Sequence, residues 1–253
     1  MPKSPDITTD DMAAEELGRL RQQIDLLDDK LLRLLEERIA VAAAVAAAKT
    51  AELGTPDKHD VGRLWRPGRE AQLLGRLIAA SSLPGMLIEG IWRQITTANL
   101  QGQTRLRFAM VKAADHLADA AIETTVNWRF GPTVPRLECT SHAAAMAALA
   151  SGEAMLAVMP HWQDDASWLP ALAAVPGCHI MAVAPLHISG LQRLAILGAG
   201  LPDPSGNDET LVFTADGKRL ESHTGYHPGR KNLAGIIQVL PSSADDAVNE
   251  ESS

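Results

Sequence analysis

The chain has 253 residues, of which 46% are hydrophobic and only 4% aromatic, which leaves room for one or two domains with substantial cores. Its formal net charge of −8 argues against a nucleic-acid partner, because such proteins present a basic surface. No apolar run approaches the roughly 20 residues of a membrane span, and the opening MPKSPDITTDD lacks the basic and apolar regions of a signal peptide. We therefore expect a cytoplasmic protein without a membrane or nucleic-acid partner.

The first structured element is a predicted helix from about residue 15 to residue 49, after a polar tail (residues 1–12) that we expect to be disordered. Its apolar residues recur alternately every four and three positions, at Leu20, Ile24, Leu27, Leu31, Leu34, Val41 and Val45. This spacing is typical of the a/d seam of a coiled coil. A helix of this length spans roughly 50 Å, more than one small domain covers, so we expect a second copy to share it.

One seam position of this helix holds an arginine, Arg38. A guanidinium group does not lose its proton, so burying it requires an anion or a dense hydrogen-bond network. Lys49 lies only about 20° away in helical phase and about 16 Å along the axis, so the two cations face one interior. Arg21 points about 100° to one side of Arg38 and therefore faces a different region.

Two shorter helices are predicted next, after a Gly- and Pro-containing loop at residues 50–68. The second helix runs from about residue 69 to 80 and opens with Arg69 and Glu70. The third runs from about residue 84 to 103, with Asn99 and Gln103 on one face at i, i+4. Its predicted inner stripe consists of Leu87, Ile91, Ile95 and Ala98.

From residue 107 short apolar runs alternate with helical stretches, which predicts an α/β domain over residues 105–240. The predicted strands contain FAMV, AMLAVMP, HIMAVAP, LAILGAG and ETLVFTA, and SHAAAMAALASG is a helix between the caps Ser141 and Gly152. Cys139 and Cys178 lack metal or redox spacing, so we expect free, buried thiols and no metal. Residues 241–253 form a predicted disordered acidic tail.

The helical part resembles the all-helical chorismate mutase family. The resemblance rests on LRQQIDLLDDKLLRLLEER, the AAAK that ends the first helix, RPGREAQLL and IWRQITTANLQGQ. It implies an all-α three-helix domain over residues 13–104 that forms an intertwined homodimer, followed by a smaller α/β domain. The family's active-site positions fall on Arg21, Arg38, Lys49, Arg69, Glu70 and Gln103, with Asn99 where a serine often stands.

The resemblance implies an isomerase of aromatic amino acid biosynthesis that converts chorismate to prephenate by an intramolecular Claisen rearrangement. This reaction needs no cofactor, metal or proton transfer. It needs a cavity that holds the folded conformer of a dianion and stabilises negative charge on the breaking ether oxygen. The cations and amides of the matched set fit this requirement.

In family terms Arg38 and the partner subunit's Arg21 clamp the two carboxylates, with Asn99 among the substrate contacts. Lys49 and Gln103 donate to the ether oxygen, and Glu70 accepts a hydrogen bond from the ring hydroxyl, oriented by Arg69. Two features depart from the family: the loop at residues 50–68 is longer, and Arg66 stands where an acidic residue is frequent.

The α/β part resembles, more weakly, the catalytic domain of prephenate dehydratases, through AAMAALASGEAMLAVMP and LQRLAILG…PSGNDETLVF. His161 and Trp162 replace the Glu-Asn pair expected after Pro160, and Gln192 replaces the catalytic threonine, so we expect a degenerate domain. The leading interpretation is a chorismate mutase whose activity resides in residues 1–104. A bifunctional mutase/dehydratase and a non-catalytic regulator with a mutase-like dimer are the alternatives.

Overall fold

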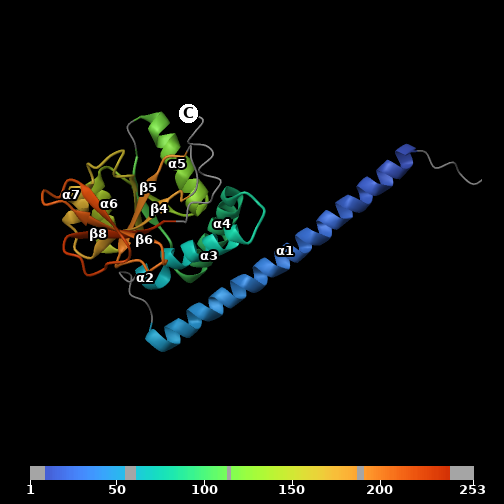
Figure 1. Ribbon diagram of the computed structural model, residues 1–253, viewed down its shortest axis with the longest axis horizontal. Helices are drawn as coiled ribbons and strands as arrows, with labels where there is room; N and C mark the ends of the chain where they lie inside the picture. The colour runs from blue at the N-terminus through green and yellow to red at the C-terminus, as the bar shows by residue number, and fades with distance from the viewer. Residues whose placement is uncertain (1–8, 55–60, 113–114, 187–190, 240–253) are drawn as a thin grey trace, which may run out of the picture. The chain divides into compact units, whose positions relative to one another are not determined.

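The computed structural model describes residues 9–54, 61–112, 115–186 and 191–239 (Figure 1), so the predicted acidic tail and residues 1–8 lie outside the described residues. The chain divides into two compact units, residues 1–49 and residues 50–253, which are described separately below. The helix α1 (Thr9–Leu53) makes up the described part of the first unit and continues four residues beyond it. It is longer than expected at both ends. Residues 9–12, predicted to be disordered, are its first turn.

The apolar row of α1 is exposed in the single chain. Its members Leu20, Ile24, Leu27, Leu31, Leu34, Val41 and Val45 are each between 43% and 61% exposed. Of the cations on the same helix, Arg38 and Lys49 are half-buried and Arg21 is exposed. The seam predicted from the sequence is therefore an apolar surface that is exposed among the described residues.

Three helices open the second unit: α2 (Val61–Leu64), α3 (Pro67–Ala79) and α4 (Gly85–Gln103). The predicted loop at residues 50–68 is wrong in part, because α1 extends to residue 53 and α2 occupies residues 61–64; residues 55–60 lie outside the described residues. The bounds of α3 and α4 agree with the prediction to within two residues. Pro67 stands in the first turn of α3, where its missing N–H and fixed φ are favourable, and Pro84 directly precedes α4.

The rest of the second unit is built on one mixed sheet of eight strands in the order β2-β1-β3-β5-β4-β8-β6-β7. The strands are β1 (Phe108–Val111), β2 (Arg136–Cys139), β3 (Leu156–Pro160), β4 (Cys178–Ala184), β5 (Leu194–Ala199), β6 (Asp208–Phe213), β7 (Leu220–Thr224) and β8 (Leu233–Gln238). The helices α5 (His116–Phe130), α6 (His142–Ser151) and α7 (Leu169–Ala173) complete it. This α/β region is larger than the helical part, not smaller, and the chain as a whole is not all-α.

Both faces of the sheet are covered. Alternate strand residues, such as Ala109 and Ala157, pack with α6 and α7 in one core. Their neighbours, such as Phe108 and Leu156, pack in a second core with residues of α2, α4 and α5. Figure 1 shows α6 and α5 on opposite sides of the strands. The helices α2 and α4 therefore share a core with the sheet, and the packing boundary lies near residue 49 instead of residue 104.

The predicted inner stripe of α4 is wrong for the single chain. Leu87 is 47% exposed and Ile91 is 44% exposed. The buried apolar residues of α4 are instead Ile88 and Leu100, the second of which joins the core beneath the sheet. The sheet takes the opposite face of the helix, so α4 presents a second uncovered apolar row.

Local sequence signals in the α/β region hold. The Ser141 side chain accepts a hydrogen bond from the N–H of Ala144, and Gly152 ends the helix in the left-handed conformation, as predicted for α6. Both cysteines are free, but only Cys178 is buried, and burial raises the pKa of its thiol. In the described part of the chain, no helix combines the length and apolarity required to cross a bilayer.

Candidate functional site

The start of α3 is fixed by Asp203, which follows β5. The Asp203 carboxylate accepts hydrogen bonds from the backbone N–H of Gly68 (3.1 Å) and Arg69 (3.0 Å), two donors that the helix itself leaves unpaired. Arg66 pairs with the same carboxylate at 3.1 Å. Only glycine fits at position 68, because a Cβ there would lie 2.1 Å from the Asp203 carbonyl oxygen. The α/β region thus sets where α3 begins and takes up the charge of the unusual Arg66.

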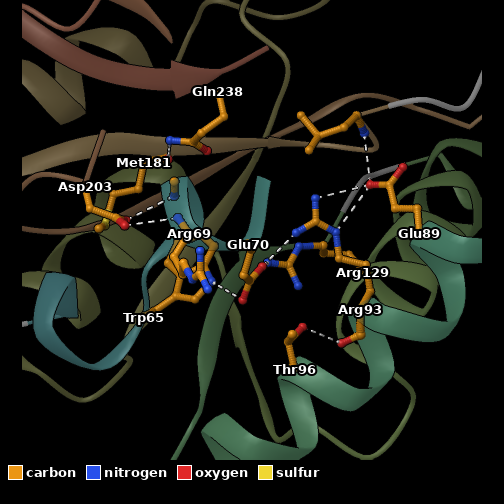
Figure 2. A network of polar contacts seen from close by, with 12 residues as sticks. Trp65, Arg69, Glu70, Glu89, Arg93, Thr96, Arg129, Met181, Asp203 and Gln238 are labelled. Carbon is orange, nitrogen blue, oxygen red and sulfur yellow. Dashed lines mark hydrogen bonds and ion pairs between the residues drawn. The ribbon is translucent and has the colours of Figure 1, made fainter. Parts of the chain in front are cut away.

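Glu70, on the first turn of α3, is held by three donors from different elements (Figure 2). Its Oε1 accepts from the indole N–H of Trp65 at 3.1 Å. Its Oε2 accepts from Arg93 of α4 at 2.7 Å and from Arg129 of α5 at 2.8 Å. The Glu70 side chain is 14% exposed, and both arginine side chains are almost fully buried. Charge-assisted hydrogen bonds of this kind are short and directional, so they restrict the carboxylate to one orientation.

Glu89 provides a second buried carboxylate next to the first. It is fully buried, and its Oε1 accepts from Nε of Arg93 (3.3 Å), Nη2 of Arg93 (3.2 Å) and the backbone N–H of Leu186 (3.4 Å). Two carboxylates therefore balance the two guanidinium groups of Arg93 and Arg129. Removing one member of such a cluster leaves an unpaired buried charge, which costs about 3–5 kcal/mol.

Arg129 is the member that the α/β region contributes. Its guanidinium carbon lies 5.5 Å from the ring centre of Trp65 and 4.6 Å from that of Phe130, within the range of cation–π attraction. Burial and, to a smaller extent, the neighbouring Arg93 lower the pKa of Arg129 to about 10, against the opposing effects of Glu70 and Glu89. The side chain is still charged at neutral pH.

The residues predicted to bind substrate are distributed over both units. Arg21, Arg38 and Lys49 lie on α1, Arg69 and Glu70 on α3, and Asn99 and Gln103 on α4. Within the second unit, Glu70 is turned toward Arg93 and Arg129. The expectation that Arg69 orients Glu70 is not met, because the Arg69 guanidinium makes a long contact of 3.5 Å with Gln72 instead. The Arg69 side chain is exposed at the start of α3, whereas the Glu70 carboxylate is bonded to Trp65, Arg93 and Arg129.

Two of these residues carry buried polar atoms without a partner. Nη1 of Arg38 and the side-chain oxygen of Asn99 are covered, yet neither has a hydrogen-bond partner among the described residues. Buried polar groups in proteins are nearly always paired, so such atoms require a ligand or a further protein group. A guanidinium N–H requires an acceptor, and the amide of Asn99 can present either its oxygen or its nitrogen.

Comparison with known proteins identifies a family for part of the chain. Residues 20–104 match the chorismate mutase type II family. This mutase segment contains all seven of the predicted site residues, so the resemblance read from the motifs is confirmed.

A bifunctional chorismate mutase/prephenate dehydratase of Pseudomonas aeruginosa is 31% identical over 121 residues, which cover 44% of this chain and 32% of the relative. The chain thus spans about a third of the length of that relative. A solved structure described as GqqA, a novel type of quorum quenching acylase, covers 56% of this chain and 97% of its own at 19% identity and a TM-score of 0.34.

The buried cluster of Trp65, Glu89, Arg93 and Arg129 around Glu70 was not predicted from the sequence. Its members are spread over more than 60 positions of the chain, and each is an ordinary residue in its local context. One signal was present: Glu89 and Arg93 stand at i, i+4 on α4, next to the apolar residue Ile88 that faces the core. A charged pair beside a buried position indicates either an internal ion pair or a contact with another element.

Proposed function

We propose that the protein is a chorismate mutase, an isomerase that converts chorismate to prephenate in aromatic amino acid biosynthesis in the cytoplasm. The match of residues 20–104 to the chorismate mutase type II family carries the proposal. The positions that the family uses hold three cations, a carboxylate and two amides in this chain: Arg21, Arg38, Lys49, Glu70, Asn99 and Gln103, with Arg69 beside them. These groups provide what a dianion with a breaking ether bond requires.

The catalytic roles follow from charge and donor capacity. Arg38 offers its unpaired Nη1 to a substrate carboxylate. Lys49 and Gln103 donate to the ether oxygen, on which negative charge grows in the transition state. Glu70 accepts from the ring hydroxyl, while Asn99 and Arg69 contribute further polar contacts. Each donor to the ether oxygen lowers the barrier by about 3–4 kcal/mol, the magnitude typical of one oxyanion-hole group.

A homodimer completes the proposal. The uncovered apolar rows of α1 and α4, with Leu31 57% and Leu87 47% exposed, fit a second copy better than water. Arg21 lies roughly 25 Å along α1 from Arg38, too far to serve the same pocket on a straight helix. In a two-fold dimer with antiparallel α1 helices, the partner subunit's Arg21 reaches the site that contains Arg38 and Lys49.

The first experiment is an assay of the purified chain with chorismate, in which loss of chorismate and appearance of prephenate are followed. Turnover in proportion to enzyme concentration is expected. Its absence in a folded, dimeric sample would favour the non-catalytic regulator. The name of the Pseudomonas relative keeps the bifunctional alternative in view, but this chain has Gln192 in place of the threonine and His161-Trp162 in place of Glu-Asn.

The second experiment tests the shared site. Arg21→Ala and Lys49→Ala homodimers should each be nearly inactive, because every site lacks one cation. After subunit exchange half of the dimers are hybrids, and each hybrid contains one site with both lesions and one with neither. Activity should therefore recover to about a quarter of the wild-type value. Recovery that stays at the level of the separate variants, with exchange verified, would mean that Arg21 acts within its own subunit.

A further inference from the structure

The orientation of the Glu70 carboxylate depends on residues beyond the mutase segment. Trp65 and Arg93 lie within residues 20–104, but Arg129 belongs to α5, the first helix of the α/β region. Figure 2 shows Glu70 pointing at the guanidinium groups of Arg93 and Arg129. A carboxylate that acts on a substrate is thus bonded to a part of the chain that no family role covers.

The three donors leave Glu70 one free direction. Each carboxylate oxygen has about two acceptor sites. Both acceptor sites of Oε2 are used by Arg93 and Arg129, whereas Oε1 accepts only from Trp65. The unused acceptor site on Oε1 is the one available to a hydroxyl group, and its direction is fixed by the three bonds to the rest of the carboxylate.

Arg93 alone cannot provide the same restraint. Two of its nitrogens, Nε and Nη2, are already bonded to Glu89, so Nη1 is the nitrogen that reaches Glu70. Arg129 supplies the second bond to Oε2 and the charge that balances the second carboxylate. Its position is itself restrained, because its guanidinium lies over the rings of Trp65 and Phe130. A further hydrogen bond joins α4 and α5, in which the side-chain amide of Gln94 donates to the carbonyl of Trp128 at 3.0 Å.

We propose that Arg129, acting with Arg93, is a positioning residue for the mutase: it fixes the Glu70 carboxylate so that Oε1 meets the substrate hydroxyl. This inference rests on the proposed chorismate mutase activity. It makes the α/β region a structural component of the mutase site. The competing interpretation is a purely structural ion-pair cluster, whose loss affects stability but not the activity of the folded protein.

The test uses the full-length protein and a double-mutant cycle. Arg129→Gln should lower kcat/KM for chorismate about 10- to 100-fold, since a misplacement of about 1 Å can cost that much. Glu70→Gln should lower it at least as far. Adding Arg129→Gln to Glu70→Gln should change kcat/KM less than about 3-fold, because residues that act through one group are not additive. Arg136→Gln is the matched control: Arg136 pairs with Glu123 of α5 but does not contact Glu70.

Thermal unfolding of the same variants separates positioning from stability. Each single variant leaves an unpaired charge in the cluster and should unfold at a lower temperature than wild type. The double variant retains the balanced Glu89–Arg93 pair and should regain part of the loss. The activity of the folded Arg129→Gln protein should be low, whereas a purely structural role predicts that the folded variant keeps the wild-type kcat/KM. If Arg129→Gln does not fold, Arg129→Lys retains the charge without the planar fork and should show a partial loss of kcat/KM.

The outcomes are distinct. A wild-type protein without turnover removes the proposed function and leaves the cluster untouched. An active wild type with a folded Arg129→Gln or Arg129→Lys variant of unchanged kcat/KM overturns the positioning role. A loss of the same size with and without Glu70 also overturns it, because Arg129 would then act by another route.

Discussion

Replacing Asp203 tests how far the α/β region controls the helix that carries Glu70. In Asp203→Ala the N–H groups of Gly68 and Arg69 lose their acceptor, which costs about 1–2 kcal/mol for a helix cap. The negative charge at the start of α3 contributes about 0.3–1 kcal/mol more. The ion pair with Arg66 contributes under about 1 kcal/mol, because the Arg66 side chain is 47% exposed. The expected loss is therefore about 2–3 kcal/mol.

Urea unfolding measures this loss, followed by the circular dichroism of the helices. With a slope of about 2–3 kcal/mol per molar urea, the midpoint of Asp203→Ala should fall by about 1 M. Asp203→Asn retains an oxygen acceptor without the charge and should lie between the variant and wild type. Arg66→Gln removes only the ion pair and should shift the midpoint by less than about 0.5 M. The reasoning is refuted if Arg66→Gln and Asp203→Ala shift the midpoint equally.

Three further predictions concern the second unit. Burial and, to a smaller extent, Arg193 lower the pKa of His161 to about 4, against the opposing effect of Asp164. As the pH falls, the unfolded chain binds the proton before the folded protein does, so the free energy of unfolding should fall by roughly 3 kcal/mol between pH 6.5 and 4. Urea titrations of His161→Asn should not show this acid-dependent loss. A fragment of residues 1–104 should aggregate or lose its compact helices in size-exclusion and circular dichroism measurements, because it uncovers Trp65 and its neighbours in the core; this revises the expectation of an independent mutase, and a folded, active fragment would restore it. Prephenate should not be converted to phenylpyruvate by the full chain, and a rate that scales with enzyme concentration would revive the bifunctional alternative.

The sequence predicts elements whose signals are local. The α6 helix was found with both ends because Ser141 and Gly152 satisfy its terminal groups by themselves. Strands β1 and β3 to β6 were found because continuous apolar runs belong to a sheet with both faces covered. Strands β2 and β7 were missed because RLEC and LESHT are polar segments at the two edges of the sheet. Strand β8 was missed because Gly235 weakens its pattern.

In the candidate site, too, the residues with a local sequence signal were predicted and those that depend on packing were not. Arg38 was noticed because one charged residue interrupts a regular apolar seam. The surroundings of Glu70 could not be predicted, because they depend on which face of α4 the sheet covers. The sequence suggested that the face of α4 with Leu87 and Ile91 is buried. In the structure the buried face is the one with Ile88, and Arg93 lies on that face. A single helix pattern with two apolar rows does not say which row meets which partner.

The position of β8 has a consequence for how the chain is made. This strand lies between β4 and β6 in the middle of the sheet, although it is the last of the described strands along the chain. During synthesis, the edges of β4 and β6 that pair with β8 have no partner strand until residues 233–238 leave the ribosome. Open edges pair with other chains, so nascent or prematurely terminated products are prone to aggregate and to attract chaperones. A chain terminated between residues 214 and 232 would have β6 but not β8, and its sheet would be split between β4 and β6.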